Sequence, residues 1–472
     1  MLSKLRIINF KAWEDTGEIR LAPLTLIFGA NSIGKSSLGH LLIALQQTLA
    51  SSDRKQAFRF GDEDSTVDLG TYHDCVFQHN TDLKIGFSLG WNLEKNLKVK
   101  DIPNQSSDAT ERIELIQGNS LEISVDLACR RDGQQAYVES LKYDLRNDEC
   151  AACTVEYRHA NSRHEWAGTE GVRLYRNVGR QWPADAPEKF YRMSDQSRAR
   201  FQNAGFIQDF AYSLEEVFSK FFYLGPLRES PKRTYRWAGD TPNGVGVRGE
   251  NTVSALLAAM DSRRTLNEGR KKTTKNFSEL ISKQLRDMGL LNEFSIQRIS
   301  DDHKDYEVEV QTNRTGVGVK LPDIGFGVSQ SLPPVVQAFY CPPHSTIWME
   351  QPEIHLHPQA QAELADVFIR AVNSYEKSTP RNVQLIIESH SEHFLQRLQR
   401  RVAEKKISKE MVAIYFCRRK SNRLVLEPLF LDLFGNIQNW PKNFFGDEWS
   451  DLKGRMVAEL NRRKALENDI DD

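Results

Sequence analysis

The stretch Gly29 to Ser37, which reads GANSIGKSS, decides how the rest of the chain is interpreted. It matches the spacing G-x-x-x-x-G-K-S/T of a phosphate-binding loop. In such a loop two glycines, here Gly29 and Gly34, allow backbone N–H groups to turn toward phosphate oxygens. Lys35 adds a positive charge for the β- and γ-phosphates, and the Ser36 hydroxyl is a ligand for Mg²⁺. The motif therefore predicts a nucleotide site.

The residues on either side of this loop have the pattern that such a site needs. Residues 24–28 form an apolar run typical of a buried strand, and residues 37–49 place leucines at helical spacing on one face. Alternation over residues 5–10 predicts another strand, and residues 66–90 look like two more strands joined by a turn. A strand, a phosphate-binding loop and a helix in this order predict an α/β fold.

Two short apolar runs in the second half of the chain, residues 345–349 and 383–387, predict strands buried on both faces of a parallel sheet. Glu350 follows the first run and is placed to hold the hydration shell of Mg²⁺. His390 follows the second and can hydrogen-bond a γ-phosphate or orient water. The alternatives are an acid that merely ends a strand and a structural histidine.

A second glycine-rich segment lies at residues 323–331, DIGFGVSQS, after the strand-like run YEVEVQT. Its glycines free the backbone, and Ser329 falls where a helix should begin, so the segment is a second anion site. One nucleotide does not need two such cradles. We therefore expect the second cradle to close on the nucleotide of another subunit, in a head-to-tail dimer that holds two ATP molecules.

Together, the segments GANSIGKSS, GFGVSQS, IWMEQPEIHLHP and LIIESHS resemble the ABC-type ATPase heads of RecF, structural-maintenance-of-chromosomes and OLD proteins. The resemblance is closest to the stand-alone bacterial ATPases of anti-phage defence operons, such as the Septu ATPase. It covers roughly residues 1–90 and 300–420. The tail FLDLFGNIQNWPKNFFGDEW resembles a small uncharacterised C-terminal domain that is common in these ATPases.

The resemblance implies ATP and Mg²⁺ as cofactors and assigns roles to individual residues. Glu350 takes the Walker B position as a metal-contacting and catalytic acid, and His390 is the switch histidine. Gln78 is a weaker candidate for the Mg²⁺-contacting glutamine of the Q-loop, with a solvated turn residue as the other interpretation. The Walker A loop comprises Asn31, Gly34, Lys35, Ser36 and Ser37. The signature loop, which would contact the nucleotide bound to the partner subunit, comprises Gly327, Ser329 and Gln330.

Gln351 occupies the position at which an ABC-type hydrolase usually has its catalytic glutamate. An amide cannot accept the proton of the attacking water, although it can orient that water. Either Glu353, His355 or His357 takes over as the base, or ATP is a structural clamp in a long-lived closed dimer. Glu353 is favoured, because His357 and Pro358 look like the start of a helix. Loss of a general base forfeits about 10²- to 10⁴-fold, so we expect slow turnover, on the order of minutes.

The resulting fold is an α/β, ABC-type P-loop ATPase head with a mixed or parallel sheet, split by an insertion. Residues 1–90 and 301–420 form the two halves of the head, and residues 421–472 form a small C-terminal domain. Residues 91–300 are expected to be a largely helical insertion that starts with β-hairpins. Within it, residues 263–286 hold eight Lys or Arg against two Glu. This run is a candidate contact for DNA or a phage component, or a solvated face.

The composition is that of an ordinary globular protein. The chain has 472 residues, a formal net charge of -1 and 39% hydrophobic residues, so there is no global electrostatic case for binding nucleic acid or a membrane. Its start, MLSKLRIINFKAW, turns polar too early for a signal peptide, and no run approaches the roughly 18 apolar residues of a membrane span. Six scattered cysteines make no disulfide framework. These features predict a cytoplasmic protein.

The function expected from these patterns is that of an ATP-binding, slowly hydrolysing sensor or regulatory subunit of an anti-phage defence system. It would control a separately encoded effector, a nuclease or toxin, because the sequence shows no Toprim-like acidic cluster and no HNH pattern. One alternative is a DNA-engaging repair or chromosome-maintenance ATPase of the RecF kind. The other is a scaffold in which ATP is bound and never hydrolysed.

Overall fold

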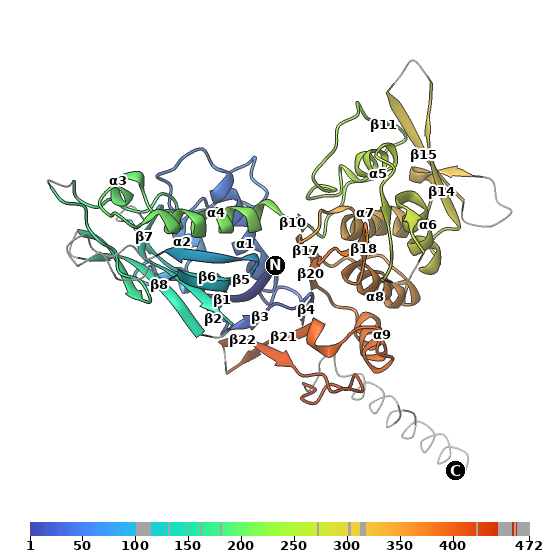
Figure 1. Ribbon diagram of the computed structural model, residues 1–472. Helices are drawn as coiled ribbons and strands as arrows, with labels where there is room; N and C mark the ends of the chain where they lie inside the picture. Colours follow the sequence, from blue (N-terminus) through green and yellow to red (C-terminus); the bar gives the residue numbers. More distant parts are fainter. Residues whose placement is uncertain are drawn as a thin grey trace, which may run out of the picture.

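The computed structural model describes residues 1–100, 115–130, 133–148, 150–160, 163–179, 182–270, 273–300, 304–311, 318–421, 423–441, 456 and 459. Figure 1 shows an antiparallel sheet on one side and a parallel sheet with flanking helices on the other. The helices are α1 (Ser36–Ala50), α2 (Tyr72–Cys75), α3 (Asp195–Arg198), α4 (Gly205–Ser219), α5 (Thr252–Asp261), α6 (Phe277–Asp287), α7 (Phe326–Tyr340), α8 (Pro358–Val372) and α9 (Glu392–Ala403).

The antiparallel sheet has the strand order β2-β1-β5-β6-β7-β8-β9, with β3 also pairing with β1. Its strands are β1 (Leu2–Phe10), β2 (Trp13–Asp15), β3 (Ile19–Arg20), β5 (Ile85–Lys100), β6 (Leu115–Cys129), β7 (Ala136–Asn147), β8 (Cys150–Ala160) and β9 (Arg163–Glu170). Helix α4 lies along it, as Figure 1 shows. One face of this sheet is therefore covered, and the strands alternate buried and exposed residues.

The second sheet has the order β10-β17-β20-β4-β21-β22, and its pairs are parallel except for β21 with β22. Its strands are β10 (Phe221–Leu224), β17 (Thr346–Glu350), β20 (Gln384–Glu388), β4 (Leu24–Gly29), β21 (Val412–Lys420) and β22 (Arg423–Leu429). The predicted strands at residues 24–28, 345–349 and 383–387 are thus neighbours. Their carboxyl ends meet at one edge, which is where ligands bind in sheets of this kind.

The parallel sheet is buried on both faces, and each strand sends side chains into two cores. On β4, Leu24 and Leu26 enter the core built with α7, α8 and α9. Ile27 enters the opposite core, which contains α1, α4 and the antiparallel sheet. Trp348 on β17 lies in the same core as Ile27. The continuous apolar runs of the sequence follow from this arrangement, because neither face of the sheet meets water.

A third group of elements packs beyond α7. The small sheet β11-β15-β14, with β16 beside β15, combines β11 (Tyr235–Arg236), β14 (Glu293–Arg298), β15 (Asp305–Gln311) and β16 (Val319–Lys320). Two short ribbons complete it: β12 (Thr265–Leu266) with β13 (Lys275–Asn276), and β18 (Tyr375–Glu376) with β19 (Thr379–Pro380). Three 3-10 turns occur in the described chain: η1 (Phe77–His79), η2 (Leu321–Asp323) and η3 (Lys409–Met411).

The mixed α/β fold is confirmed, but residues 91–300 differ from the expected helical insertion. Strand β5 runs from Ile85 to Lys100 across the expected boundary at residue 90, and Trp91 within it is fully buried. Strands β6 to β9 extend the N-terminal sheet, and helices come only after residue 194. Strand β10 pairs with β17, so the parallel sheet takes a strand from the middle of the chain. Long antiparallel strands with one polar face lack the continuous apolar runs that mark buried strands in a sequence, which explains the difference.

Residues 66–90 also differ from the expected strand pair. The chain forms α2 and η1 before β5 begins. Asp74 explains the local helix: its carboxylate accepts hydrogen bonds from the backbone N–H and the hydroxyl of Thr71, at 2.8 and 2.7 Å, in a capping box. No helix in the described part of the chain is long and apolar enough to cross a membrane.

The contact of α1 with β17 requires a glycine. A Cβ atom added to Gly39 would lie 2.5 Å from the indole of Trp348. We expect Gly39→Ala to lower the free energy of unfolding by about 1 to 3 kcal/mol, because the added methyl overpacks the core. Gly205→Ala is the matched control, since nothing lies within 4 Å of a Cβ at Gly205. Urea unfolding of both variants is the measurement, and equal stabilities would contradict the packing argument.

Candidate nucleotide-binding site

The phosphate-binding loop joins the carboxyl end of β4 to α1. Gly29, the last residue of β4, has a φ of 151°, and a Cβ there would lie 2.7 Å from the carbonyl oxygen of Cys417 on β21. Gly34 has a φ of 101°, and Trp13 Nε1 donates a 3.0 Å hydrogen bond to its carbonyl. Both conformations are those that glycine adopts readily. Ala30, Asn31 and Ser32 at the tip of the loop are exposed.

Lys35 lies at the centre of the loop and is only 5% exposed. Its ammonium donates to the carbonyl oxygens of Gly29 and Ala30 at 3.0 and 2.8 Å. The same nitrogen lies 3.1 Å from Nε2 of His390. Burial lowers the pKa of Lys35, and burial with the lysine nearby lowers the pKa of His390 to about 4. His390 is therefore neutral at pH 7 and faces the same space as the lysine.

Two carboxylates face the start of α1. Glu350 and Glu388 end the adjacent strands β17 and β20 and are register partners. Glu350 Oε1 accepts a 2.8 Å hydrogen bond from the hydroxyl of Tyr223 on β10 and lies 3.7 Å from His40 Nε2. Glu388 accepts hydrogen bonds from Ser36 Oγ at 2.9 Å and from Trp348 Nε1 at 3.0 Å. The sequence patterns predicted Glu350 as a site residue but missed Glu388. The available signal was that Glu388, like Glu350, directly follows a short apolar run that predicts a buried strand.

Burial sets the protonation of this pair. Burial raises the pKa of Glu350, and burial together with the charge of Glu350 raises the pKa of Glu388 to about 8. A group with a raised folded-state pKa contributes stability at low pH and loses that contribution as the pH rises through the folded-state value.

The metal-free protein should therefore lose stability between the ordinary glutamate pKa of 4.5 and about 8. The slope from one group is at most about 1.4 kcal/mol per pH unit. Glu388→Gln should be less sensitive to pH than the wild type across this window. Thermal unfolding of both proteins in EDTA at a series of pH values measures the difference. Parallel pH profiles would show that Glu388 is ionised in the folded protein throughout.

Gln351 and Glu353 lie in the loop that follows β17. Gln351 has a φ of 44°, and its N–H donates to the Glu388 carbonyl at 2.8 Å. Glu353 is 5% exposed, and its Oε1 accepts hydrogen bonds from Ser389 Oγ and from the N–H of His390, both at 2.8 Å. Its Oε2 is buried without a hydrogen-bond partner, and burial raises the pKa of Glu353. Glu353 thus joins the loop after β17 to the loop after β20.

Arg228 stabilises the loop after β17 by hydrogen bonds to backbone carbonyl oxygens. It is 7% exposed, and its Nη2 donates to the carbonyl oxygens of Glu350 and Gln351 at 3.2 and 3.4 Å. Burial lowers its pKa to about 10, so the guanidinium remains charged at neutral pH. The position of Arg228 depends on strand β10, which the sequence patterns did not assign to the parallel sheet.

The predicted signature segment starts α7, as expected, but its polar side chains are enclosed. Ser329 is 7% exposed and Gln330 is 3% exposed. The loop at residues 229–235 and Gly249 line a small hollow with Ser329. Arg233 pins this loop to Asp323 through hydrogen bonds of 3.0 and 2.7 Å. A partner's nucleotide would reach Ser329 only after this loop moved, whereas Gly325 at the helix start is exposed.

Several weaker candidates lie elsewhere. Gln78 is exposed in η1, and no hydrogen bond among the described residues joins it to Ser36 or Glu350. His357 caps α8, where its Nδ1 accepts from Gln359 N at 3.4 Å, as the capping interpretation predicts. His355 is exposed with a φ of 65°.

The basic run at residues 263–286 is partly engaged in ion pairs within the fold. Arg264 binds Glu376 through Nε and Nη2 at 2.9 and 2.8 Å, and Lys283 binds Glu268 at 2.5 Å. These two side chains are therefore structural, and fewer charges remain for a partner than the sequence suggests.

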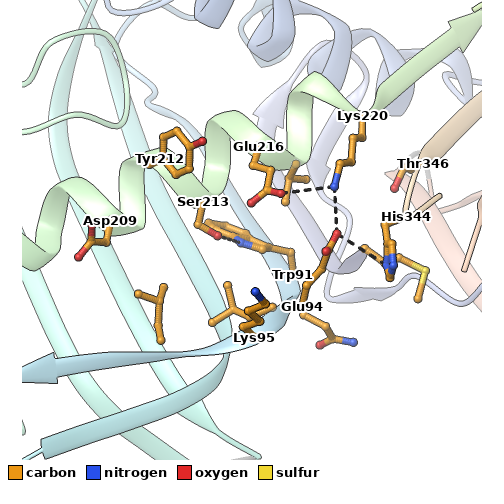
Figure 2. A pocket seen from close by; sticks show the side chains of 15 residues that line it. Trp91, Glu94, Lys95, Asp209, Tyr212, Ser213, Glu216, Lys220, His344 and Thr346 are labelled. Atoms are coloured by element: carbon orange, nitrogen blue, oxygen red, sulfur yellow. Dashed lines mark hydrogen bonds and ion pairs between the residues drawn. The ribbon is translucent and has the colours of Figure 1, made fainter. Parts of the chain in front are cut away.

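A separate hollow of about 410 Å³ lies between α4 and β5 (Figure 2). Lys220 donates to Glu94 on β5 and to Glu216 on α4 at 3.0 and 3.3 Å, and His344 lies 3.7 Å from Glu94. Because Lys220 directly precedes β10, these contacts link the antiparallel sheet to the strand that carries Tyr223. None of the residues that line this hollow belongs to the predicted nucleotide site.

The nucleotide site has the chemistry that ATP and Mg²⁺ require. The backbone of the glycine loop and the buried ammonium of Lys35 suit phosphate oxygens. The hydroxyl of Ser36 and the carboxylate of Glu350 are hard oxygen donors of the kind that Mg²⁺ prefers. A bound Mg²⁺ would neutralise charge on the β- and γ-phosphates.

Comparison with known proteins agrees with this chemistry. Residues 250–395 match the AAA ATPase domain family, and residues 407–453 match a family described as a protein of unknown function, DUF3696. The first match includes Glu350 and His390, whereas the phosphate-binding loop precedes it in the chain and joins it through β4. The second match overlaps the predicted C-terminal domain at residues 421–472, and part of it lies outside the described residues. A comparison with curated proteins found no match.

Three solved structures of SMC heads are similar to this chain, and each covers 91% of it. The SmcHead bound to the C-winged helix domain of ScpA is 11% identical, with 98% of that chain covered and a TM-score of 0.43. The SMC head domain from Thermotoga maritima is 9% identical, with 98% covered and a TM-score of 0.38. The Smc head bound to ScpA derived from Pyrococcus furiosus is 9% identical, with 96% covered and a TM-score of 0.36. The AAA ATPase domain match supports ATPase activity.

Proposed function

We propose that this chain is a Mg²⁺-dependent ATPase that turns over slowly and closes as a head-to-tail dimer around two ATP molecules. One observation carries the proposal: Lys35, Ser36, Glu350 and His390 converge at the carboxyl edge of three adjacent parallel strands. Phosphoryl transfer depends chiefly on such positioning and charge stabilisation.

The same site supports slow hydrolysis. Gln351 cannot take a proton from water, and the Glu353 carboxylate is engaged with Ser389 and His390. Neutral His390 can hydrogen-bond a phosphate oxygen or a water molecule, and its position is fixed through its own N–H by Glu353. Ser36 and Glu350 would hold Mg²⁺. The chain therefore has the means to bind and orient ATP, with a weak base for the attacking water.

Dimerisation is tested by mixing two defective variants. Gly325→Glu places a charged side chain at the exposed start of α7, where a Cβ meets nothing within 4 Å, so the protomer should fold and bind ATP. It should not dimerise, because the new carboxylate repels the partner's phosphates. Lys35→Ala should also remain monomeric. A mixture of the two restores one complete composite site, so ATP should produce dimers only in the mixture, as seen by analytical ultracentrifugation. Dimers in neither the wild type nor the mixture would overturn the proposal.

We further propose that nucleotide state controls a separately encoded effector in a bacterial anti-phage defence system. Support comes from the resemblance of the four motifs to stand-alone defence ATPases, and from the pairing of Arg264 and Lys283 with acids, which leaves less basic surface for DNA. The gene neighbours should encode a nuclease or toxin that co-purifies with the chain in a nucleotide-dependent manner. Stimulation of hydrolysis by DNA, without such a partner, would favour a repair ATPase instead.

A further inference from the structure

The acid that accepts the hydrogen bond of the Ser36 hydroxyl is Glu388, while Glu350 lies close enough to this hydroxyl for Ser36 to lower its pKa. Ser36 Oγ donates a 2.9 Å hydrogen bond to Glu388 Oε2, while the second oxygen of Glu388 accepts from Trp348 Nε1 at 3.0 Å. Glu388 is 2% exposed and Trp348 is fully buried, so the carboxylate is fixed at both oxygens. Glu350 receives its hydrogen bond from Tyr223 instead.

This arrangement has a consequence for a hydroxyl that must bind a metal. A serine hydroxyl has one proton and two lone pairs. When the proton points to Glu388, the lone pairs point away from that carboxylate and are available to a cation. Groups that orient a metal ligand in this way typically change metal affinity 10- to 100-fold when they are removed.

We propose that Glu388 is a positioning residue for Mg²⁺: it accepts the hydrogen bond of the Ser36 hydroxyl, leaves the hydroxyl lone pairs available to the metal, and is itself held by Trp348. The inference rests on the proposed function, because it concerns the Mg²⁺ of the same ATP site. Glu388 lies on β20, next to β17, and does not replace the general base that is absent at position 351.

The test is a titration of Mg²⁺ against binding of a fluorescent ATP analogue, with binding in EDTA measured separately. Glu388→Gln should raise the Mg²⁺ concentration for half-saturation about 10- to 100-fold. The amide has an NH₂ group in place of one carboxylate oxygen, so it cannot accept at both of the positions where Ser36 and Trp348 donate. Nucleotide affinity in EDTA should change much less than Mg²⁺ affinity, because Glu388 meets the loop through its hydrogen bond to Ser36 and acts on Lys35 only through its charge.

A pair of double-mutant cycles separates positioning from a general loss of negative charge. Glu350→Gln is the matched control, since Glu350 is the same residue type at the paired register position. Glu388→Gln should have little further effect in a Ser36→Ala background, because Glu388 acts through Ser36. Glu350→Gln should still weaken Mg²⁺ binding in the Ser36→Ala background, because Glu350 would bind the metal directly. An unchanged Mg²⁺ half-saturation in Glu388→Gln, or additivity of Glu388→Gln with Ser36→Ala, overturns the inference.

A measurement on the unaltered site guards against misfolded variants. With 5-fluorotryptophan incorporated, the Trp348 resonance is identified by its loss in Trp348→Phe. It should shift when Mg²⁺ is added to the ATP-bound protein and should not shift in Ser36→Ala. A wild type that binds no ATP, with or without Mg²⁺, would refute the proposed function itself; a wild type that binds Mg²⁺ and ATP with no shift of Trp348 refutes only the role of Glu388.

Discussion

Lys35→Ala is expected to lower the affinity for ATP by about 10- to 150-fold, since a hydrogen bond to a charged group contributes about 1.5 to 3 kcal/mol and every 1.4 kcal/mol is tenfold. The ammonium is the cation at the centre of the loop, and its three donors lie on two carbonyl oxygens and beside His390. A triphosphate offers these donors charged acceptors, which bind them more strongly than neutral carbonyls do. Calorimetric titration of ATP in the presence of Mg²⁺ measures the loss.

The folded protein should tolerate the same substitution. Burial lowers the pKa of Lys35, which means that the charged form is not favoured by its surroundings in the absence of nucleotide. We expect the thermal midpoint without ATP to stay close to that of the wild type, while the rise caused by ATP disappears. Lys55→Ala, at an exposed lysine of the same half of the chain, should keep the full rise. Undiminished stabilisation of Lys35→Ala by ATP would mean that nucleotide binds elsewhere.

The part of the site built on local motifs was predictable from the sequence. The glycine loop between an apolar strand and a helix, and the apolar strands that precede Glu350 and His390, can each be recognised from a few adjacent residues. Because parallel strands bring their carboxyl ends to one edge, the predicted residues meet in the structure without any knowledge of long-range contacts.

The part of the site that the sequence did not predict depends on contacts between residues far apart in the chain. Strand β10 has four residues and lies more than 100 residues from β17, so nothing local shows that Tyr223 reaches Glu350 or that Arg228 supports Gln351. Glu388 was not predicted as a site residue because the neighbouring His390 had already been assigned as the functional residue after that strand. The loop that lies beside Ser329 is joined to Asp323 by Arg233, across 90 positions of the sequence.

Glu353 shows how a structure changes the interpretation of a residue that the sequence selected. Its acidity suggested a base that replaces the glutamate missing at 351. In the structure its Oε1 accepts hydrogen bonds from Ser389 and from the N–H of His390, so Glu353 links the loop after β17 to the loop after β20. The raised pKa suits a base, and the free Oε2 leaves one oxygen for that purpose. As a base or as a positioning residue, Glu353 is needed for activity, so Glu353→Gln should lose activity in both cases. Only the positioning role predicts that the substitution also lowers the stability of the folded protein.

Gln351→Glu is expected to accelerate hydrolysis by about 10²- to 10⁴-fold, the usual contribution of a positioned general base. The substitution changes an amide to a carboxylate of nearly the same shape. The backbone at 351 is already fixed by the N–H bond to the Glu388 carbonyl and by Arg228 on its own carbonyl, so the side chain should keep its direction. Negative charge on Glu350 next to it would raise the pKa of the new acid and make it a better proton acceptor.

Phosphate release in a single turnover, measured beside Gln351→Asn and Glu353→Gln, tests this expectation. Gln351→Asn is the matched control, because it shortens the side chain and adds no base. If Gln351→Glu is fast and Glu353→Gln is inactive at unchanged stability, Glu353 is the weak base of the wild type, and its rate should rise with pH through the raised pKa of that carboxyl. If Gln351→Glu is no faster than Gln351→Asn, a proton acceptor at 351 is not what limits the rate, and the opening of the loop over Ser329 becomes the step to measure.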